Sequence, residues 1–197
     1  MGKEQNLILT CFRHPKAPPT NRRAALIRLP CWRAAAVAKM PGACFNKGMD
    51  PFLQAAIEEA RKGLAEGGIP IGSVLVCDGQ IIGRGHNQRV QRGSVIHHAE
   101  MNCLENAGRR KASVYQRCVL YSTLSPCPMC SGAALLYKIP RIVIGENTTF
   151  QGPEEYVRSQ GVVVEVRQDE DCIRLMREFI AARPELWNED IGVEGKV

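Results

Sequence analysis

No stretch of this 197-residue sequence is apolar over the roughly 20 residues that a membrane-spanning helix needs. Arg, Lys, Gly or Pro interrupts every hydrophobic run, so the sequence predicts a protein without a membrane-spanning helix. Hydrophobic residues make up 45% of the chain. At this length they suffice for one substantial core but not for two ordinary domains, and we therefore expect a single domain.

Acidic residues and serine are nearly absent from residues 1–48. This segment holds one acid, Glu4, no serine, and nine of the 26 Lys and Arg residues. Its five prolines interrupt any long helix, so we predict a basic, mostly disordered extension. The arginine content resembles that of a mitochondrial transit peptide, although the missing serines and the prolines disagree with one. A dispensable extension ahead of a start at Met40 or Met49 is the other interpretation.

The rest of the chain is weakly acidic. Subtracting the nine basic and one acidic side chains of residues 1–48 from the totals of 26 and 20 leaves 17 basic and 19 acidic in residues 49–197. A domain that binds tRNA or DNA normally carries a basic surface, because neutralisation of phosphates supplies much of its affinity. We therefore do not expect nucleic acid as a partner.

The nine cysteines do not indicate a disulfide framework. An odd count without a convincing secretory signal favours reduced thiols in an intracellular protein. We expect this protein in the cytoplasm, or in both the cytoplasm and the nucleus. Four of the cysteines lie in apolar periodic segments and are predicted to be buried as small hydrophobic residues. These four are Cys77, Cys103, Cys118 and Cys172.

Hydrophobic periodicity predicts alternating helices and strands from Met49 onward. Asp50 can cap the first helix, and Asp78-Gly79 is a strong signal for a two-residue hairpin turn. Such alternation indicates an α/β domain whose sheet is covered by helices on both faces. The predicted helices are Pro51–Glu66, His98–Ala107, Cys127–Tyr137, Asp169–Ala182 and a short one from Pro184 to Asp190; the predicted strands are Ile71–Cys77, Gln80–His86, Arg117–Ser122, Arg141–Gly145 and Val162–Val166.

Two short motifs carry the chemistry. His98-Ala99-Glu100 opens one predicted helix, and Pro126-Cys127-Pro128-Met129-Cys130 opens another. Cysteines at i and i+3 in a first helical turn face one point, and a helix N-terminus favours the thiolate. One imidazole and two thiolates leave the fourth tetrahedral position of Zn²⁺ to water, as in catalytic zinc sites. The sequence therefore predicts one zinc ion per subunit, bound by His98, Cys127 and Cys130.

Glu100 is too close to His98 in sequence to share its ligand direction, so we predict that it moves protons between the activated water and a heterocyclic ring. An H-x-E motif followed by P-C-x-x-C is typical of zinc-dependent nucleobase deaminases. C-x-x-C alone also fits thiol–disulfide chemistry, so a non-catalytic zinc or redox module is an alternative. Because a structural zinc site needs no proton carrier, Glu100 favours the enzyme.

Beyond these motifs the chain resembles the fungal cytosine deaminases, within the cytidine and deoxycytidylate deaminase superfamily, from about Gly48 to Gly192. The most distinctive match is Trp187-Asn188-Glu189-Asp190-Ile191-Gly192. The other matching runs are Gly67-Gly68-Ile69-Pro70-Ile71-Gly72, Gly83-Arg84-Gly85-His86-Asn87, Thr123-Leu124-Ser125-Pro126-Cys127 and Gly145-Glu146-Asn147. The resemblance implies a three-layer α/β/α fold with a five-stranded mixed sheet, a catalytic domain at 49–192 and a short tail at 193–197.

The resemblance also implies a homodimer that hydrolyses free cytosine to uracil and ammonia in pyrimidine salvage, and that accepts 5-methylcytosine and 5-fluorocytosine. Asn87 and the backbone N–H of Ala99 are implied as donors to the 2-oxo group, with Glu100 at N3. Asp190 is implied as the acceptor of N1–H, which a nucleoside lacks, so the free base is preferred. The further implied substrate contacts are the ring-stacking walls Phe150 and Trp187, together with Ile71, Leu124 and Ser125, under a terminal helix that acts as a lid.

The chain departs from the fungal pattern at two positions. Ala99 stands where that family usually has glycine, and Asn188 replaces an aromatic residue. His98-Ala99-Glu100 is also the form found in tRNA adenosine deaminases, which the run from Cys127 to Gly132 resembles as well. Deamination of adenosine to inosine in tRNA is therefore the alternative enzymatic function.

Overall fold

A computed structural model describes residues 50–193 of the chain. The predicted extension at 1–48 and, apart from Val193, the predicted tail at 193–197 lie outside the described residues. The helices are α1 (Pro51–Ala65), α2 (Arg89–Arg92), α3 (Ala99–Ala107), α4 (Ala112–Tyr115), α5 (Pro128–Leu136), α6 (Glu154–Ser159), α7 (Glu170–Ala182) and α8 (Pro184–Asp190). The strands are β1 (Gly72–Cys77), β2 (Gln80–His86), β3 (Cys118–Leu124), β4 (Arg141–Glu146) and β5 (Val163–Val166).

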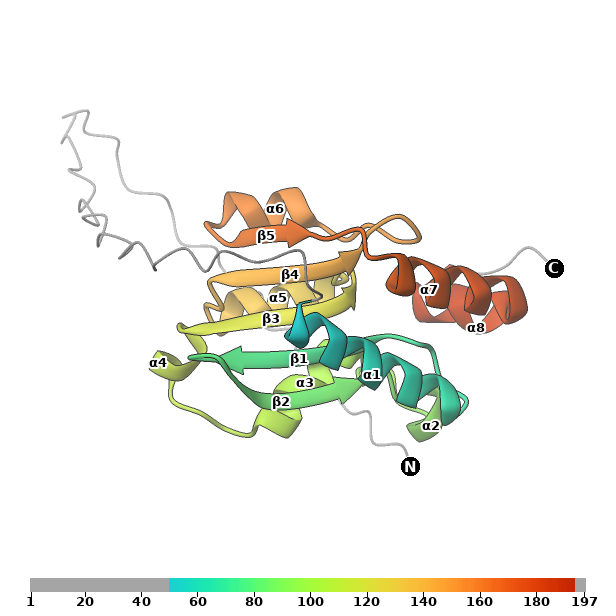
Figure 1. Cartoon of the computed structure of the whole chain (residues 1–197), viewed down its shortest axis with the longest axis horizontal. Coiled ribbons are helices and arrows are strands. Elements are labelled where there is room, and N and C mark those ends of the chain that lie inside the picture. The colour runs from blue at the N-terminus through green and yellow to red at the C-terminus, as the bar shows by residue number, and fades with distance from the viewer. Residues whose placement is uncertain (1–49, 194–197) are drawn as a thin grey trace, which may run out of the picture. The chain divides into compact units, whose positions relative to one another are not determined.

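The five strands form one mixed sheet in the order β2-β1-β3-β4-β5 (Figure 1). The strand β1 pairs antiparallel with β2 and β3, whereas β3, β4 and β5 pair in parallel. Asp78 and Gly79 join β1 to β2 with positive φ angles of 49° and 79°. Two such residues make the turn whose twist matches a hairpin, so the predicted turn and the mixed sheet are both confirmed.

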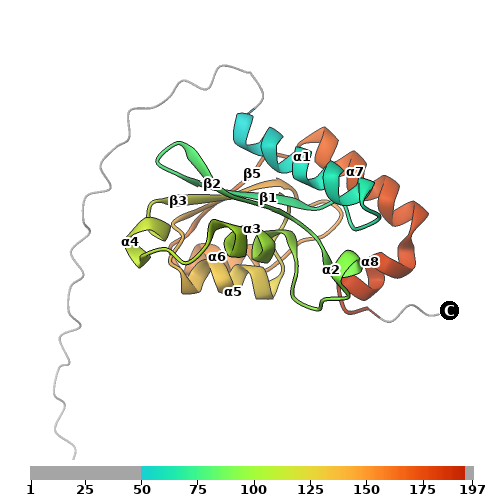
Figure 2. The ribbon, with the colours of Figure 1, turned by 90° about the horizontal axis from the view of Figure 1, so that it is seen from below.

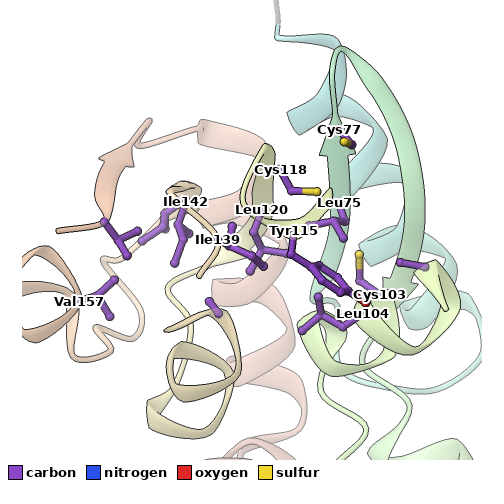
Figure 3. Packing of buried hydrophobic residues seen from close by; sticks show 14 residues of the cluster. Leu75, Cys77, Cys103, Leu104, Tyr115, Cys118, Leu120, Ile139, Ile142 and Val157 are labelled. Carbon is purple, nitrogen blue, oxygen red and sulfur yellow. The ribbon is translucent and has the colours of Figure 1, made fainter. Parts of the chain in front are cut away.

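Helices cover both faces of the sheet, and Figure 2 shows α1 and α7 on one face and α3, α5 and α6 on the other. Side chains alternate along β1, because Val74 and Val76 pack under α1 while Leu75 and Cys77 join the opposite core. Figure 3 shows part of that opposite core, in which Leu120 and Tyr115 lie close to Leu75. The predicted three-layer α/β/α fold is confirmed, and the four cysteines predicted to be buried are buried.

The long elements begin and end within two residues of their predicted bounds. Asp50 caps α1, since its Oδ1 accepts from the N–H of Phe52 at 3.0 Å. The strand β3 runs on to Leu124, two residues further than predicted, because Leu124 pairs with Glu146 of β4. The sequence analysis missed α2, α4 and α6, which have four, four and six residues. Elements this short contain too little of a helical period to be recognised.

Two glycines of β2 allow α3 to lie directly on the sheet. A Cβ atom at Gly83 would approach the carbonyl oxygen of Cys103 to 2.6 Å, and one at Gly85 would approach the Cys103 nitrogen to 2.4 Å. Both contacts are with backbone, which cannot move aside without shifting the helix. The glycines therefore set the position of α3, and with it the position of His98 at its start.

Among the helices within residues 50–193, none combines the length and the hydropathy that a membrane crossing demands.

Candidate metal centre and active-site cavity

The predicted metal ligands meet where two helices begin. His98 is the N-cap residue of α3 and Cys127 is the N-cap residue of α5, while Cys130 lies in the first turn of α5. Neither N-cap side chain bonds to the amides of its own helix. Pro128 favours a helix start directly after Cys127, because its ring presets a helical φ and its missing N–H needs no partner. The sequence thus brings three ligands from two segments to one point.

The donor set fits a zinc ion. One ligand atom from each of His98, Cys127 and Cys130 lies within 4.8 Å of the others. The Nδ1 atom of His98 is 3.6 Å from the Sγ atom of Cys127. Zn–S and Zn–N bonds of about 2.3 and 2.0 Å place tetrahedral ligands about 3.5 Å apart, which agrees with this separation. Two sulfurs and one imidazole also favour zinc over magnesium or calcium, because the latter two ions prefer oxygen ligands.

The two cysteines share a proton unequally. A hydrogen bond from Cys130, reinforced by His98, lowers the pKa of Cys127 to about 4 despite burial. The same pairing and burial raise the pKa of Cys130 above its ordinary value. The positive end of α5 adds to the preference for thiolate at Cys127. Such a pair holds one negative charge by itself, and a divalent cation bound to both sulfurs would displace the remaining proton to solvent.

Glu100 lies in the first turn of α3, with only 3% of its surface exposed. The hydroxyl of Ser122 on β3 donates to its Oε1 atom at 3.1 Å. Burial and the negative charge of Cys127 raise the pKa of the Glu100 carboxyl. These surroundings favour the protonated form more than water does, and a proton carrier must exist in both its protonated and its ionised form.

A cavity of about 320 Å³ opens beside the metal ligands. Phe150 and Trp187 form part of its wall, with ring centroids 6.0 Å apart in an edge-to-face arrangement. Asp190, at the end of α8, contributes a carboxylate. The structure therefore brings most predicted site residues together. The complete lining is Ile71, His98, Ala99, Glu100, Leu124, Ser125, Cys127, Pro128, Met129, Phe150, Trp187, Asp190, Ile191 and Gly192.

The side chains of two predicted substrate contacts form hydrogen bonds to other residues of the protein. Asn87 is fully buried and does not line the cavity; its Nδ2 donates to Asp190 Oδ1 at 3.1 Å. Ser125 lines the cavity, but its hydroxyl donates to Glu154 Oε1 at 2.8 Å and accepts from the N–H of Gly152 at 3.1 Å. That bridge holds the loop that carries Phe150.

Sequence reasoning missed Arg89, whose guanidinium group contacts Asp190 at 2.9 Å. The two residues are 101 positions apart, and α2 has no periodic signal of its own. The only hint in the sequence was that Arg89 follows the predicted site residue Asn87 by two positions. Met129, Ile191 and Gly192 were also not predicted to line the cavity, although they adjoin predicted site residues.

Comparisons with known proteins agree with this geometry. Residues 47–146 match the family model described as the cytidine and deoxycytidylate deaminase zinc-binding region. A cytosine deaminase of Candida albicans is 50% identical over 141 residues, which are 71% of this chain and 94% of that protein. A tRNA-specific adenosine deaminase of Bacillus subtilis is 35% identical over 138 residues, which are 65% of this chain and 86% of that protein.

Solved structures repeat the fold. A structure from a study of A-to-I editing by tRNA:A34 deaminases superimposes with a TM-score of 0.54 at 26% identity, covering 64% of this chain and 98% of that one. A guanine deaminase of Nitrosomonas europaea superimposes with a TM-score of 0.58 at 23% identity, covering 66% and 83%, and shows the fold alone.

Together, the fold and the metal ligands define a zinc-dependent deaminase domain, in which one sheet lies between two layers of helices. The chain belongs to the cytidine and deoxycytidylate deaminase zinc-binding family. His98, Cys127 and Cys130 form its zinc-binding triad.

Replacing one ligand should remove the metal. We expect Cys130→Ala to lower the zinc content of the purified protein from about one ion per chain to a small fraction of that, because two ligands bind zinc weakly. Elemental analysis after dialysis measures the ratio. Cys103→Ala is the matched control, since burial raises the pKa of the Cys103 thiol to about 12 and it lies outside the triad. Equal zinc contents in the two variants would contradict the assignment.

Proposed function

We propose that the protein hydrolyses free cytosine to uracil and ammonia. The main support is that two carboxyl groups in different environments, those of Glu100 and Asp190, line one cavity beside the zinc triad. The 50% identity to a cytosine deaminase of Candida albicans supports the same reaction. We extend the proposal to 5-methylcytosine and 5-fluorocytosine, whose small 5-substituents demand little more space than cytosine itself.

The cavity can orient a flat heterocycle. Because the rings of Phe150 and Trp187 are almost perpendicular, one of them can stack on a face of the heterocycle while the other contacts its edge, with Ile71 and Leu124 as apolar neighbours. We assign the backbone N–H of Ala99 to the 2-oxo group. We assign the amide of Asn87 to the same group, because its NH₂ has two N–H donors and only one of them is used by Asp190. Ser125 contributes a wall, with its hydroxyl holding the neighbouring loop.

Asp190 distinguishes a free base from a nucleoside in this proposal. Its carboxylate accepts the N1–H of cytosine, and a nucleoside carries a sugar at that nitrogen instead. The side chain of Asp190 is only 3% exposed, so a ligand without the N–H would leave a desolvated oxygen unpaired. The free base is therefore favoured by both the gained hydrogen bond and the avoided penalty.

Glu100 carries the protons of the reaction. Zinc bound to the triad supplies a Lewis acid that makes water a stronger nucleophile near neutral pH. Glu100 takes a proton as water adds to C4 of the ring and gives one to N3. It then takes the remaining proton from the C4 hydroxyl group and delivers it to the amino group, so that the C4–N bond breaks and ammonia leaves as the C4 carbonyl forms. Burial raises the pKa of Glu100, which suits a group that must be charged and neutral in turn.

A tRNA adenosine deaminase is the alternative that a specific observation favours. Two tRNA-specific adenosine deaminases are 35% and 43% identical to this chain over their aligned regions. The region aligned with the more similar of the two covers 52% of this chain. The weakly acidic charge of residues 49–197 argues against a polyanionic substrate. A non-catalytic zinc or redox module is disfavoured by the buried Glu100, which such a module would not need.

A substrate panel separates these functions. We expect purified protein to release ammonia from cytosine far faster than from cytidine or dCMP, and to leave tRNA unchanged, because Asp190 selects for N1–H. Ammonia is measured with each compound at the same concentration, and tRNA is analysed for inosine. Inosine formation in tRNA together with inert cytosine would establish the alternative function and contradict the proposal.

Glu100→Gln tests the proton carrier. We expect this variant to keep its zinc but to lose about 10²–10⁴-fold in kcat on cytosine, because glutamine keeps the shape without the titrating oxygen. The matched control is Glu105→Gln, which changes an exposed carboxylate of the same helix. Full activity of the Glu100 variant would show that another group moves the protons.

We further propose that the protein is a homodimer whose contact surface lies beside α3 and α5. Val95, Ile96 and Leu136 expose 76%, 53% and 73% of their surface, which is unusual for large apolar residues. A groove of about 680 Å³ lies next to them, lined in part by Met101 and Tyr137. Ile96 is two residues before the zinc ligand His98, so a second copy at this surface would steady the active-site loop.

Light scattering after size exclusion tests the homodimer. We expect a mass of two chains for the wild type and of one chain for Leu136→Glu, because a buried carboxylate without a partner disfavours the contact. Leu64→Glu is the control, since Leu64 is also an exposed apolar residue but belongs to α1 on the opposite face of the sheet. A monomeric wild type, or equal masses for the two variants, would contradict the proposed surface.

For the compartment we propose the cytoplasm. The six cysteines within residues 50–193 are free, which suits a reducing environment. Nuclear or mitochondrial targeting depends on residues 1–48 and stays a prediction from their composition.

A further inference from the structure

Each of the three guanidinium nitrogens of Arg89 donates a hydrogen bond to an oxygen atom of the protein. Its NH1 donates to Asp190 Oδ1 at 2.9 Å and its NH2 to Glu189 Oε1 at 2.6 Å. Its Nε donates to the carbonyl oxygen of Ser94 at 3.3 Å. The side chain is only 10% exposed. A charged group so enclosed has a defined position, unlike the surface ion pairs elsewhere in the chain.

The contacts of Asp190 are all made by one of its two oxygens. Oδ1 accepts from Arg89 and, at 3.1 Å, from Asn87 Nδ2. No hydrogen bond from any residue between 50 and 193 reaches Oδ2. Because Asp190 lines the cavity, the second oxygen is the one available to a ligand. Arg89 therefore determines which oxygen is occupied and which one is left for the substrate.

Arg89 also orients Asn87. The backbone N–H of Arg89 donates to Asn87 Oδ1 at 3.0 Å, which leaves the Asn87 amide NH₂ group to face Asp190. One residue thus fixes two polar side chains, the first through its main chain and the second through its guanidinium group. Both of those side chains are assigned to the substrate in the proposed function.

The same guanidinium group connects the lid helix to the rest of the site. Glu189 and Asp190 are the last two residues of α8, and Arg89 opens α2, so the ion pairs join two short helices (Figure 2). NH1 also donates to the Glu189 carbonyl oxygen at 3.4 Å, where the negative end of a helix favours a cation. His98 Nε2, 3.9 Å from Asp190 Oδ1, is too far for a second strong bond.

We propose that Arg89 is a positioning residue for base selection: it holds Asp190 so that Oδ2 meets the N1–H of a free pyrimidine base. The inference rests on the proposed function, because it assigns N1–H to Asp190. Arg89 touches no substrate atom. It acts by holding the enclosed carboxylate in one orientation, which an aspartate without this partner would not keep.

The test is a double-mutant cycle of Arg89→Met, Asp190→Asn and the double variant, assayed with cytosine and 1-methylcytosine. The methyl group of 1-methylcytosine replaces the hydrogen that Asp190 accepts. For Arg89→Met we expect a loss in kcat/KM on cytosine of about 30-fold or more, carried mainly by KM, because one partner of a buried charge pair is removed. We expect a much smaller loss on 1-methylcytosine, so the preference between the two bases falls.

In the Asp190→Asn background the same Arg89 substitution should change kcat/KM by less than about 3-fold, since Arg89 acts through Asp190. Losses that multiply independently, or an unchanged preference between the two bases, would overturn the proposal while leaving the proposed function intact. A wild type that releases no ammonia from cytosine would instead overturn the proposed function, and the role of Arg89 with it.

Two further variants separate positioning from folding. Arg183→Met removes an exposed ion pair to Glu185 at the start of α8, and we expect unchanged kinetics. Arg89→Lys keeps the charge without the two-pronged geometry, and we expect it to restore part of the KM. If the melting temperature or zinc content of Arg89→Met falls, Arg89→Lys replaces it in the cycle, and the same criterion of additivity decides.

Discussion

The convergence of two helix N-termini is the constraint on which the rest of this structure depends. Gly83 and Gly85 let α3 lie against β2, and the N–H of Ser125 bonds to the Glu146 carbonyl oxygen at 3.0 Å where β3 turns toward α5. These two backbone contacts place His98 and Cys127 within bonding distance of one cation. A shift of either helix by a fraction of a bond length would spoil a tetrahedral site. The metal chemistry is thus determined first by strand–helix packing.

Around that centre, two carboxyl groups are given opposite surroundings. Glu100 is buried next to a thiolate, which raises its pKa, and its one neutral partner is Ser122. Asp190 is equally enclosed but is paired with Arg89. Burial beside a thiolate favours the protonated form of Glu100, whereas the guanidinium group of Arg89 holds the Asp190 carboxylate in place. In the proposed function, it is their environments, and not their residue types, that give the two carboxyl groups different roles.

The sequence could predict the local part of this arrangement. Asp50, Asp78-Gly79 and the hydrophobic periods identified the long elements, since caps, turns and amphipathic faces are local properties. The H-x-E and P-C-x-x-C motifs identified the triad for the same reason. Contacts between distant segments could not be predicted: no local pattern links Arg89 to Asp190, or Ser125 to Glu154. The wall residues and Asp190 came from resemblance, not from periodicity or spacing.

The helix α8 shows why the distant contacts matter most. Its seven residues are too few for a stable helix in isolation, so tertiary contacts must hold it. Trp187 supplies an apolar contact with Phe150, and Arg89 supplies the polar one, and both contacts are made at the cavity itself. A ligand between Trp187 and Asp190 would add to the same contacts. In the proposed function, substrate binding would therefore be coupled to the position of α8, because the residues assigned to the base are also those that keep the helix in place.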